Sequence, residues 1–187
     1  MKGNRFMALA QLKTYTEKDY YSLPEDIRAE LIGGQLYYMS APSRIHQEIL
    51  NSINNTIYNY IRSRNGNCKV YPAPFAVKLF ADDDKTVVEP DISVICDPDK
   101  LTDRGCTGAP DWIVEITSPS TASHDHIRKL HLYADAGVRE YWIIDPEKKS
   151  IYVYHLEETK FETTAYTFKD RIKANIYDDL WIDFKEF

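Results

Sequence analysis

The chain has 187 residues, 43% of them hydrophobic, and a formal net charge of -6. This length and composition suffice for one domain with a sizeable core, and the charge argues against a strongly basic surface that coats nucleic acid while leaving room for a local basic patch. Its three cysteines are odd in number and show no Cys-x-x-Cys spacing, which disfavours a disulfide framework and a zinc site and favours a reducing cytoplasm. No stretch approaches the roughly 18 apolar residues of a membrane span, so we expect a cytoplasmic protein without membrane contact.

Hydrophobic periodicity, capping residues and turn residues predict alternating helices and strands along the chain. Isoleucines recur every four positions from Ile45 to Ile61, after Ser43 as a helix cap and before Gly66, which predicts one long amphipathic helix. The predicted elements in chain order are a helix over 16–23, a hairpin over 28–39 that turns at Gly33-Gly34, a helix over 43–65, strands over 69–81 and 86–96, a loop over 97–110, a strand over 111–117, a helix over 122–136, strands over 140–145 and 151–156, a polar strand after 157–160, and a last strand within 176–184.

The stretch from Asp111 to Asp145 reads strand, helix, strand, and is long enough for a right-handed βαβ crossover. We therefore expect one α/β or α+β domain, with a central mixed sheet flanked by helices. In this domain we expect an N-terminal helical extension over 1–27, a core over about 28–156 and C-terminal strands over 157–187.

Two of the predicted strands carry an acid among apolar residues, Asp91 in VVEPDISVIC and Glu115 in DWIVEIT. A buried, unpaired carboxylate costs several kcal/mol, so each acid needs a partner or an exposed position. Neighbouring strands could set the two side by side, and adjacent carboxylates repel unless a proton or cation lies between them. Two carboxylates and water suit Mg²⁺. For either acid alone, a strand end with a salt bridge to Arg or Lys is the better explanation.

The helix that follows Glu115 carries Asp125, Lys129 and Tyr133 at four-residue spacing, on one face. A lysine on a face that packs against the sheet needs a partner, and Glu115 is a candidate. The alternative is an ordinary Asp–Lys helix pair in which the lysine stem lies along apolar surface and its ammonium reaches water.

Several of these segments together resemble the Uma family of restriction endonucleases, within the PD-(D/E)xK nuclease superfamily. They are RAELIGGQL, SRIHQEI, EPDISVI, DWIVEITSPST and DHIRKLHLYADAGVREYWIIDP. The resemblance spans roughly Arg28 to Leu156. It implies a restriction-endonuclease-like core, with the acids placed on a central mixed sheet.

The resemblance also assigns expected roles. Pro90-Asp91 matches the PD element, Glu115 matches the acid of the (D/E)xK element, and Glu30 resembles an upstream acid that helps to complete the metal site. Thr117 stands where the superfamily has its lysine.

A lysine on the following helix replaces it in this family, and Lys129 matches that position. His46 also matches the family and could contact the phosphate or carry a proton, although a histidine at a helix start is more often a structural hydrogen-bonding group.

The function implied is a restriction-type or mobile-element-associated DNA endonuclease that depends on Mg²⁺ or Mn²⁺. Asp91 and Glu115 would bind the metal, Lys129 would orient water or stabilise charge, and a homodimer would cut both strands. The alternative is a catalytically inactive protein that keeps the fold as a DNA-binding or oligomeric scaffold.

Other chemistries lack support in the sequence. Ser118 and Ser120 have no Gly-x-Ser-x-Gly context, and the triplet 124–126 (His-Asp-His) cannot aim three adjacent helical side chains at one metal. Glycine-rich nucleotide-binding motifs are absent from the sequence.

Overall fold

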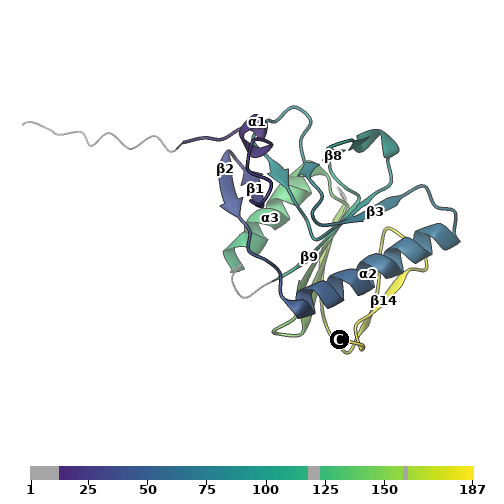
Figure 1. The fold of residues 1–187 in the computed structure, drawn as a ribbon. Coiled ribbons are helices and arrows are strands. Elements are labelled where there is room, and N and C mark those ends of the chain that lie inside the picture. Colours follow the sequence, from purple (N-terminus) through teal and green to yellow (C-terminus); the bar gives the residue numbers. More distant parts are fainter. Residues whose placement is uncertain (1–12, 118–122, 158–159) are drawn as a thin grey trace, which may run out of the picture.

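Two six-stranded sheets and a two-stranded C-terminal sheet form the framework of the residues described by the computed structural model, which are 13–117, 123–157 and 160–187 (Figure 1). Two longer helices, α2 and α3, pack against this framework, and none of the described helices is long and apolar enough to cross a membrane. The elements are α1 (Glu17–Tyr20), β1 (Ala29–Ile32), β2 (Gln35–Tyr38), α2 (Arg44–Ser63), β3 (Lys69–Pro72), β4 (Val77–Lys78), β5 (Val87–Val88), β6 (Ile92–Ile95), the 3-10 helix η1 (Pro98–Lys100), β7 (Leu101–Thr102), β8 (Gly105–Thr107), β9 (Trp112–Ile116), α3 (Ser123–Ala136), β10 (Glu140–Asp145), β11 (Ser150–Glu157), β12 (Lys160–Thr167), β13 (Arg171–Lys173) and β14 (Trp181–Asp183).

The core sheet has the strand order β12-β11-β10-β9-β6-β3. Strands β9 and β10 are parallel and α3 connects them, while the other neighbours in this sheet are antiparallel. The predicted strand–helix–strand unit is therefore confirmed, and so is the mixed sheet flanked by helices.

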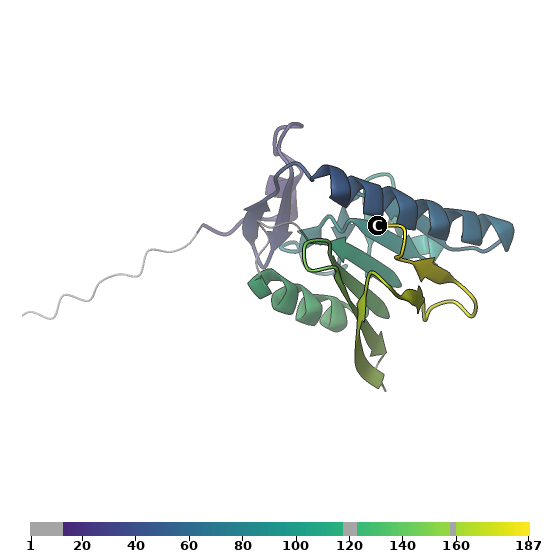
Figure 2. The same cartoon turned by 90° about the horizontal axis from the view of Figure 1, so that it is seen from below.

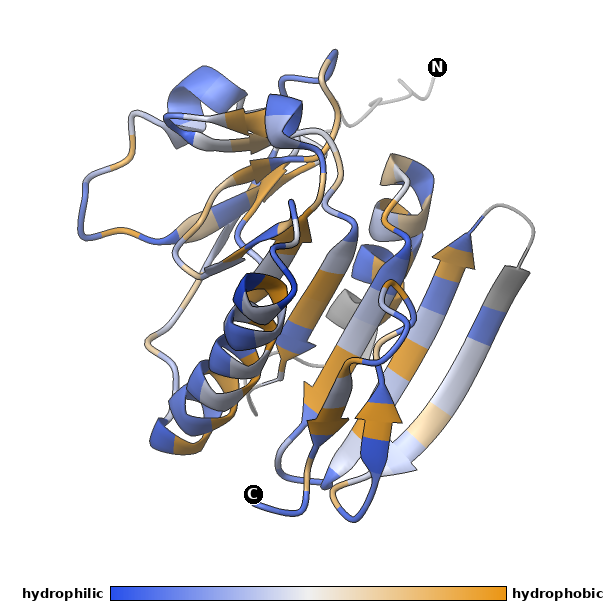
Figure 3. Cartoon of the chain, turned by 90° about the vertical axis from the view of Figure 1, so that its right-hand side faces the viewer, coloured by the Kyte–Doolittle hydropathy of each residue, from blue (hydrophilic) through white to orange (hydrophobic). Residues whose placement is uncertain are grey.

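The helices α2 and α3 cover opposite faces of the core sheet (Figure 2). Successive strand residues point to opposite faces, so alternate residues of one strand enter different cores. Trp112 of β9 packs in the same cluster as Ile53 of α2, whereas its neighbour Ile113 packs in the same cluster as Tyr133 of α3. Figure 3 shows hydrophobic residues along the central strands, while the outermost strand, β12, is mostly hydrophilic.

The second large sheet has the order β2-β1-β5-β4-β8-β7. Its hairpin turns at Gly33 and Gly34, whose positive φ angles of 56° and 76° fit the predicted glycine turn. The prediction of a loop over 97–110 is wrong, because this segment contains η1, β7 and β8. At Gly105 a Cβ would lie 2.0 Å from the carbonyl oxygen of Ala76, so only glycine permits this close approach to the adjoining chain.

Helix boundaries follow the capping residues read from the sequence. Thr16 and Ser43 cap α1 and α2, and Gly137, with φ at 92°, follows the last residue of α3. The predicted C-terminal strand is shorter than expected: only Trp181–Asp183 is a strand, paired with β13.

A disulfide joins Cys68 and Cys96, which corrects the expectation that the cysteines are unpaired. Lys69 lies opposite Ile95 in the pairing of β3 with β6, so the next pair along the two chains is Cys68 and Cys96. Their Cα atoms are 3.8 Å apart. Cys106 is a buried free thiol, and burial raises its pKa to about 11.

Candidate active site

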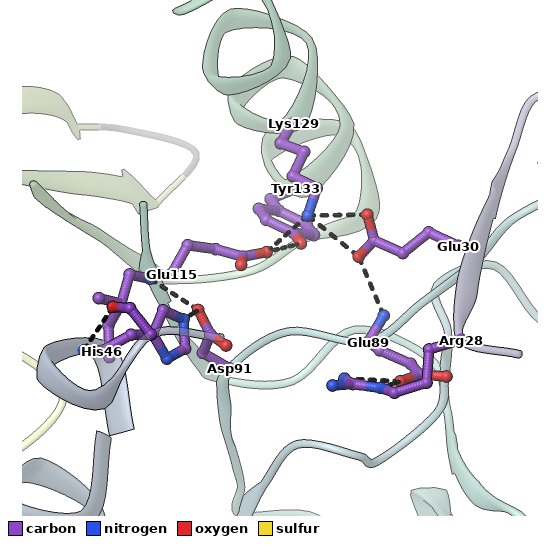
Figure 4. Close-up of polar contacts among 10 residues, drawn as sticks. Arg28, Glu30, His46, Glu89, Asp91, Glu115, Lys129 and Tyr133 are labelled. Atoms are coloured by element: carbon purple, nitrogen blue, oxygen red, sulfur yellow. Dashed lines mark hydrogen bonds and ion pairs between the residues drawn. The ribbon is translucent and has the colours of Figure 1, made fainter. Parts of the chain in front are cut away.

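Asp91 and Glu115 lie on neighbouring antiparallel segments of the core sheet, as the sequence predicted. In the pairing of β6 with β9, Ile92 lies opposite Val114, so the next pair is Asp91 and Glu115. Ile92 and Val114 face the cluster that contains α2, so Glu115, next to Val114, faces α3, whereas Asp91, which precedes β6, bonds His46 of α2. In Figure 4 the carboxylate of Glu115 lies beside Lys129, and that of Asp91 lies beside His46.

Asp91 is held through one carboxylate oxygen. Its Oδ2 accepts hydrogen bonds from the backbone N–H of Ile116 at 2.8 Å and from Nε2 of His46 at 3.1 Å. His46 lies in the first turn of α2, where it is buried, with 6% of its surface exposed. Burial alone would lower the pKa of His46, but the hydrogen bond to Asp91 and the negative charges of Asp91 and Glu115 raise it above its ordinary value.

Lys129 is a buried cation placed between two carboxylates, with 7% of its surface exposed. Its ammonium donates to Oε1 of Glu115 at 2.9 Å and contacts Oε1 and Oε2 of Glu30 at 3.0 and 2.9 Å. Burial opposes its charge, but Glu115 and Glu30 hold the pKa of Lys129 well above its usual range. The predicted contact between Lys129 and Glu115 is confirmed, and the alternative with the ammonium in water is wrong.

Glu115 shares its Oε1 between two donors, because Tyr133 also donates its hydroxyl to this atom at 2.8 Å. Burial raises the pKa of Glu115 to about 7; Lys129 opposes this rise, while Asp91 and Glu30 add to it. Tyr133 is fully buried, and its burial together with the charges of Glu115 and Glu30 keeps the pKa of its hydroxyl well above the usual range. In this cluster the carboxylates of Asp91, Glu30 and Glu115 thus outnumber the basic side chains of Lys129 and His46.

Glu89 is a neighbouring acid that the sequence analysis did not single out. Its backbone N–H donates to Oε1 of Glu30 at 3.0 Å, and its carboxylate accepts from Nε and a terminal nitrogen of Arg28 at 3.2 and 3.0 Å (Figure 4). The same carboxylate accepts from the Tyr20 hydroxyl at 2.7 Å. The available signal was its position directly before Pro90. Glu89 thus fastens the first hairpin to the chain that leads into Asp91.

Other positions singled out in the sequence lie apart from this group. Thr117 donates its backbone N–H to the carbonyl of Ile144 at 2.8 Å, so the strand continues in its pairing where the superfamily has its lysine. The side chain of Asp125, and with it Ser118, Ser120 and the side chains of His124 and His126, lie outside the described residues.

The donor atoms fit a hard divalent cation. Among the described residues, Oδ1 of Asp91 and Oε2 of Glu115 accept no hydrogen bond, while the other oxygen of each carboxylate accepts two. The described part of the chain contains no cluster of three His, Cys, Asp or Glu side chains arranged to hold a metal. Mg²⁺ commonly takes only one or two protein carboxylates and completes its shell with water and substrate phosphate, so two carboxylates suit it.

Comparison with known proteins points to nucleases. Residues 17–185 match the family model Uma2, described as "Putative restriction endonuclease". A crystal structure titled as a putative nuclease belonging to DUF820, from Anabaena variabilis ATCC 29413, superimposes with a TM-score of 0.70 and 20% identity over 86% of this chain and 89% of that one. The uncharacterized protein slr1290 of Synechocystis sp. is 28% identical over 127 residues, which are 67% of this chain and 65% of that protein.

Proposed function

The chain belongs to the Uma2 family of restriction-endonuclease-like proteins, and we propose that it is a divalent-metal-dependent endonuclease that hydrolyses phosphodiester bonds in DNA. One observation carries this proposal: Lys129 is buried between Glu30 and Glu115, and Glu115 lies directly opposite Asp91, which leads into the neighbouring strand β6. A scaffold has no need of a desolvated lysine beside a pair of acids. Such groups cost stability and cluster where charge is used in chemistry.

Asp91 and Glu115 are the residues that would hold Mg²⁺ or Mn²⁺. The bound ion would supply an acidified water and charge neutralisation at the phosphate. The mutual repulsion of the two carboxylates, which contributes to the raised pKa of Glu115, favours binding of a cation at this place.

Lys129 would stabilise negative charge on the phosphate or orient the attacking water. An ammonium has three N–H donors, and here it contacts three carboxylate oxygens. To reach the substrate, Lys129 must therefore exchange at least one of these contacts. Glu30 directs both of its oxygens at Lys129, so we assign it the task of holding the lysine rather than the metal.

The test is cleavage of plasmid and single-stranded DNA by the purified chain. We expect nicks or cuts with Mg²⁺ or Mn²⁺ and no reaction with a chelator. Asp91→Asn and Glu115→Gln should each remove most of the activity, and Lys129→Ala should lower the rate by about two orders of magnitude, the scale for loss of one electrostatic stabiliser. Asp135→Asn is the matched control, because this acid is exposed on α3.

Unchanged cleavage by Asp91→Asn or Glu115→Gln would exclude that residue as an essential metal ligand. A folded wild-type chain that neither binds Mn²⁺ nor cuts any DNA would assign the fold to a non-catalytic scaffold instead.

A further inference from the structure

The two acids of the site are held in the same way although different elements supply their partners. Each carboxylate has one oxygen that accepts two protein hydrogen bonds, and a second oxygen that accepts none among the described residues. For Asp91 the bonded atom is Oδ2, and for Glu115 it is Oε1. This division fixes which side of each carboxylate is available to a ligand.

On the Asp91 side, one donor is rigid backbone and the other is a buried ring. The N–H of Ile116 belongs to β9, and the His46 ring is positioned by the first turn of α2, where the Ser43 hydroxyl accepts from the His46 N–H at 3.3 Å. A carboxylate can only accept, so Nε2 of His46 carries the proton of this bond. With Nε2 committed to Asp91 and Nδ1 buried, the ring presents no nitrogen to a substrate.

On the Glu115 side, Tyr133 is as inaccessible as His46. Its ring is fully buried in the cluster under α3 and lies edge-on to Tyr141, with ring centroids 4.9 Å apart and an interplanar angle of 76°. Its hydroxyl donates to Oε1, the same atom that receives Lys129. Tyr133 can therefore influence a reaction only through Glu115.

We infer that Tyr133 and His46 are positioning residues that hold one oxygen of Glu115 and of Asp91, so that Oε2 and Oδ1 are left to bind the divalent cation. This inference rests on the proposed function, since it concerns the same site. Partners of this kind fix the orientation of a ligand before the metal arrives, and their loss typically lowers metal affinity or activity about 10- to 100-fold. His46 then orients Asp91, instead of contacting the phosphate or carrying a proton as the sequence suggested.

The experiment is calorimetric titration of Mn²⁺ into the metal-free full chain, without DNA. Tyr133→Phe removes only the hydroxyl, and His46→Leu removes the ring donor; we expect each to weaken Mn²⁺ binding about 10-fold or more. His46→Gln places an amide nitrogen near the position of Nε2 and should restore most of the affinity. In cleavage assays of Tyr133→Phe, saturating Mn²⁺ should return the rate towards that of the wild type.

Tyr60→Phe is the control, because it removes a bond from a tyrosine hydroxyl to a carboxylate, that of Asp179, at the other end of α2. Wild-type Mn²⁺ affinity in folded Tyr133→Phe and His46→Leu would overturn the inference and leave the proposed function intact. Absence of Mn²⁺ binding in the wild type would overturn both. If Tyr133→Phe does not fold, the comparison of His46→Leu with His46→Gln decides: equal affinities reject the inference, and restoration by glutamine supports it.

Discussion

Lys129 is the residue on which the electrostatics of the site depend. It is the cation that contacts both Glu30 and Glu115, and all three side chains are largely removed from water, with side-chain exposures of 9%, 5% and 14%. Removal of one partner from a buried ion pair leaves an uncompensated charge, which costs about 3–5 kcal/mol. The cost depends on pH, because Glu115 titrates near neutrality.

Lys129→Met should destabilise the metal-free protein more at about pH 8 than near pH 5. The pKa of Glu115 is raised from 4.5 to about 7, so its contribution to stability is complete below 4.5 and is lost as the pH rises through 7. Without the ammonium this pKa rises further, and the ionised form becomes more costly. Urea unfolding at the two pH values measures the difference, and Lys148→Met is the exposed control.

An equal loss of stability for Lys129→Met at both pH values would contradict this account of Glu115. So would a loss no greater than that of Lys148→Met.

For single residues, the sequence predicted those contacts that follow from the spacing of residues along a strand or a helix. Asp91 and Glu115 follow from two apolar strands, and Lys129 from a helix face that must pack on the sheet. The double contact with Glu30 could not be predicted, because it depends on how a second sheet sits against α3. The same holds for the bond from His46 to Asp91, since a helix cap sets where a helix begins but not which strand end lies beside it.

At the scale of elements, Glu89 connects parts of the chain that pack on different sides of the site. It accepts from Tyr20 in α1 and from Arg28 just before β1, and its own position lies between β5 and β6. Its side chain is 11% exposed, so these bonds are shielded from water much more than those of a surface pair. They fix the hairpin β1–β2, and with it Glu30, to the chain that carries Asp91.

Glu89→Ala should therefore lower the free energy of unfolding by about 1–3 kcal/mol, the cost of leaving the largely buried Tyr20 hydroxyl without its acceptor. The matched control is Glu48→Ala, which breaks an exposed Glu–Arg pair with Arg44 on α2 and should cost only about 0.3–0.5 kcal/mol. Chemical denaturation of both variants gives the comparison. Equal costs for the two would show that Glu89 does not fasten the hairpin.

Elements with a strong local signal were predicted well, and those defined by distant pairing were not. The isoleucine spacing of α2 and the glycines of the first hairpin determine structure within a few residues, whereas β7 and β8 arise from an Asp- and Gly-rich stretch that becomes a strand pair only beside β4. The disulfide was missed for the same reason. Cysteine count and spacing do not reveal that residues 68 and 96 face each other across β3 and β6.

At the scale of the whole molecule, we propose that two chains act together. If each site cuts one strand, two sites related by a two-fold axis would cut a duplex most directly. Light scattering at the concentration used for cleavage should give twice the chain mass of 21.8 kDa, and plasmid should become linear without a build-up of nicked circles. A monomer that accumulates nicked circles would contradict the dimer.

The two large sheets meet at the segment Glu89-Pro90-Asp91, which leads from β5 in one to β6 in the other. The proline is buried and its ring fixes one backbone dihedral, so the segment is short and stiff. It is held at both ends: Glu89 bonds Tyr20 and Arg28 beside the first hairpin, and Asp91 bonds His46 of α2 and the backbone of β9. Because this stiff segment is bonded at both ends, and the Glu89 N–H also bonds Glu30, the position of one sheet against the other sets how far the Glu30–Lys129 pair lies from Asp91.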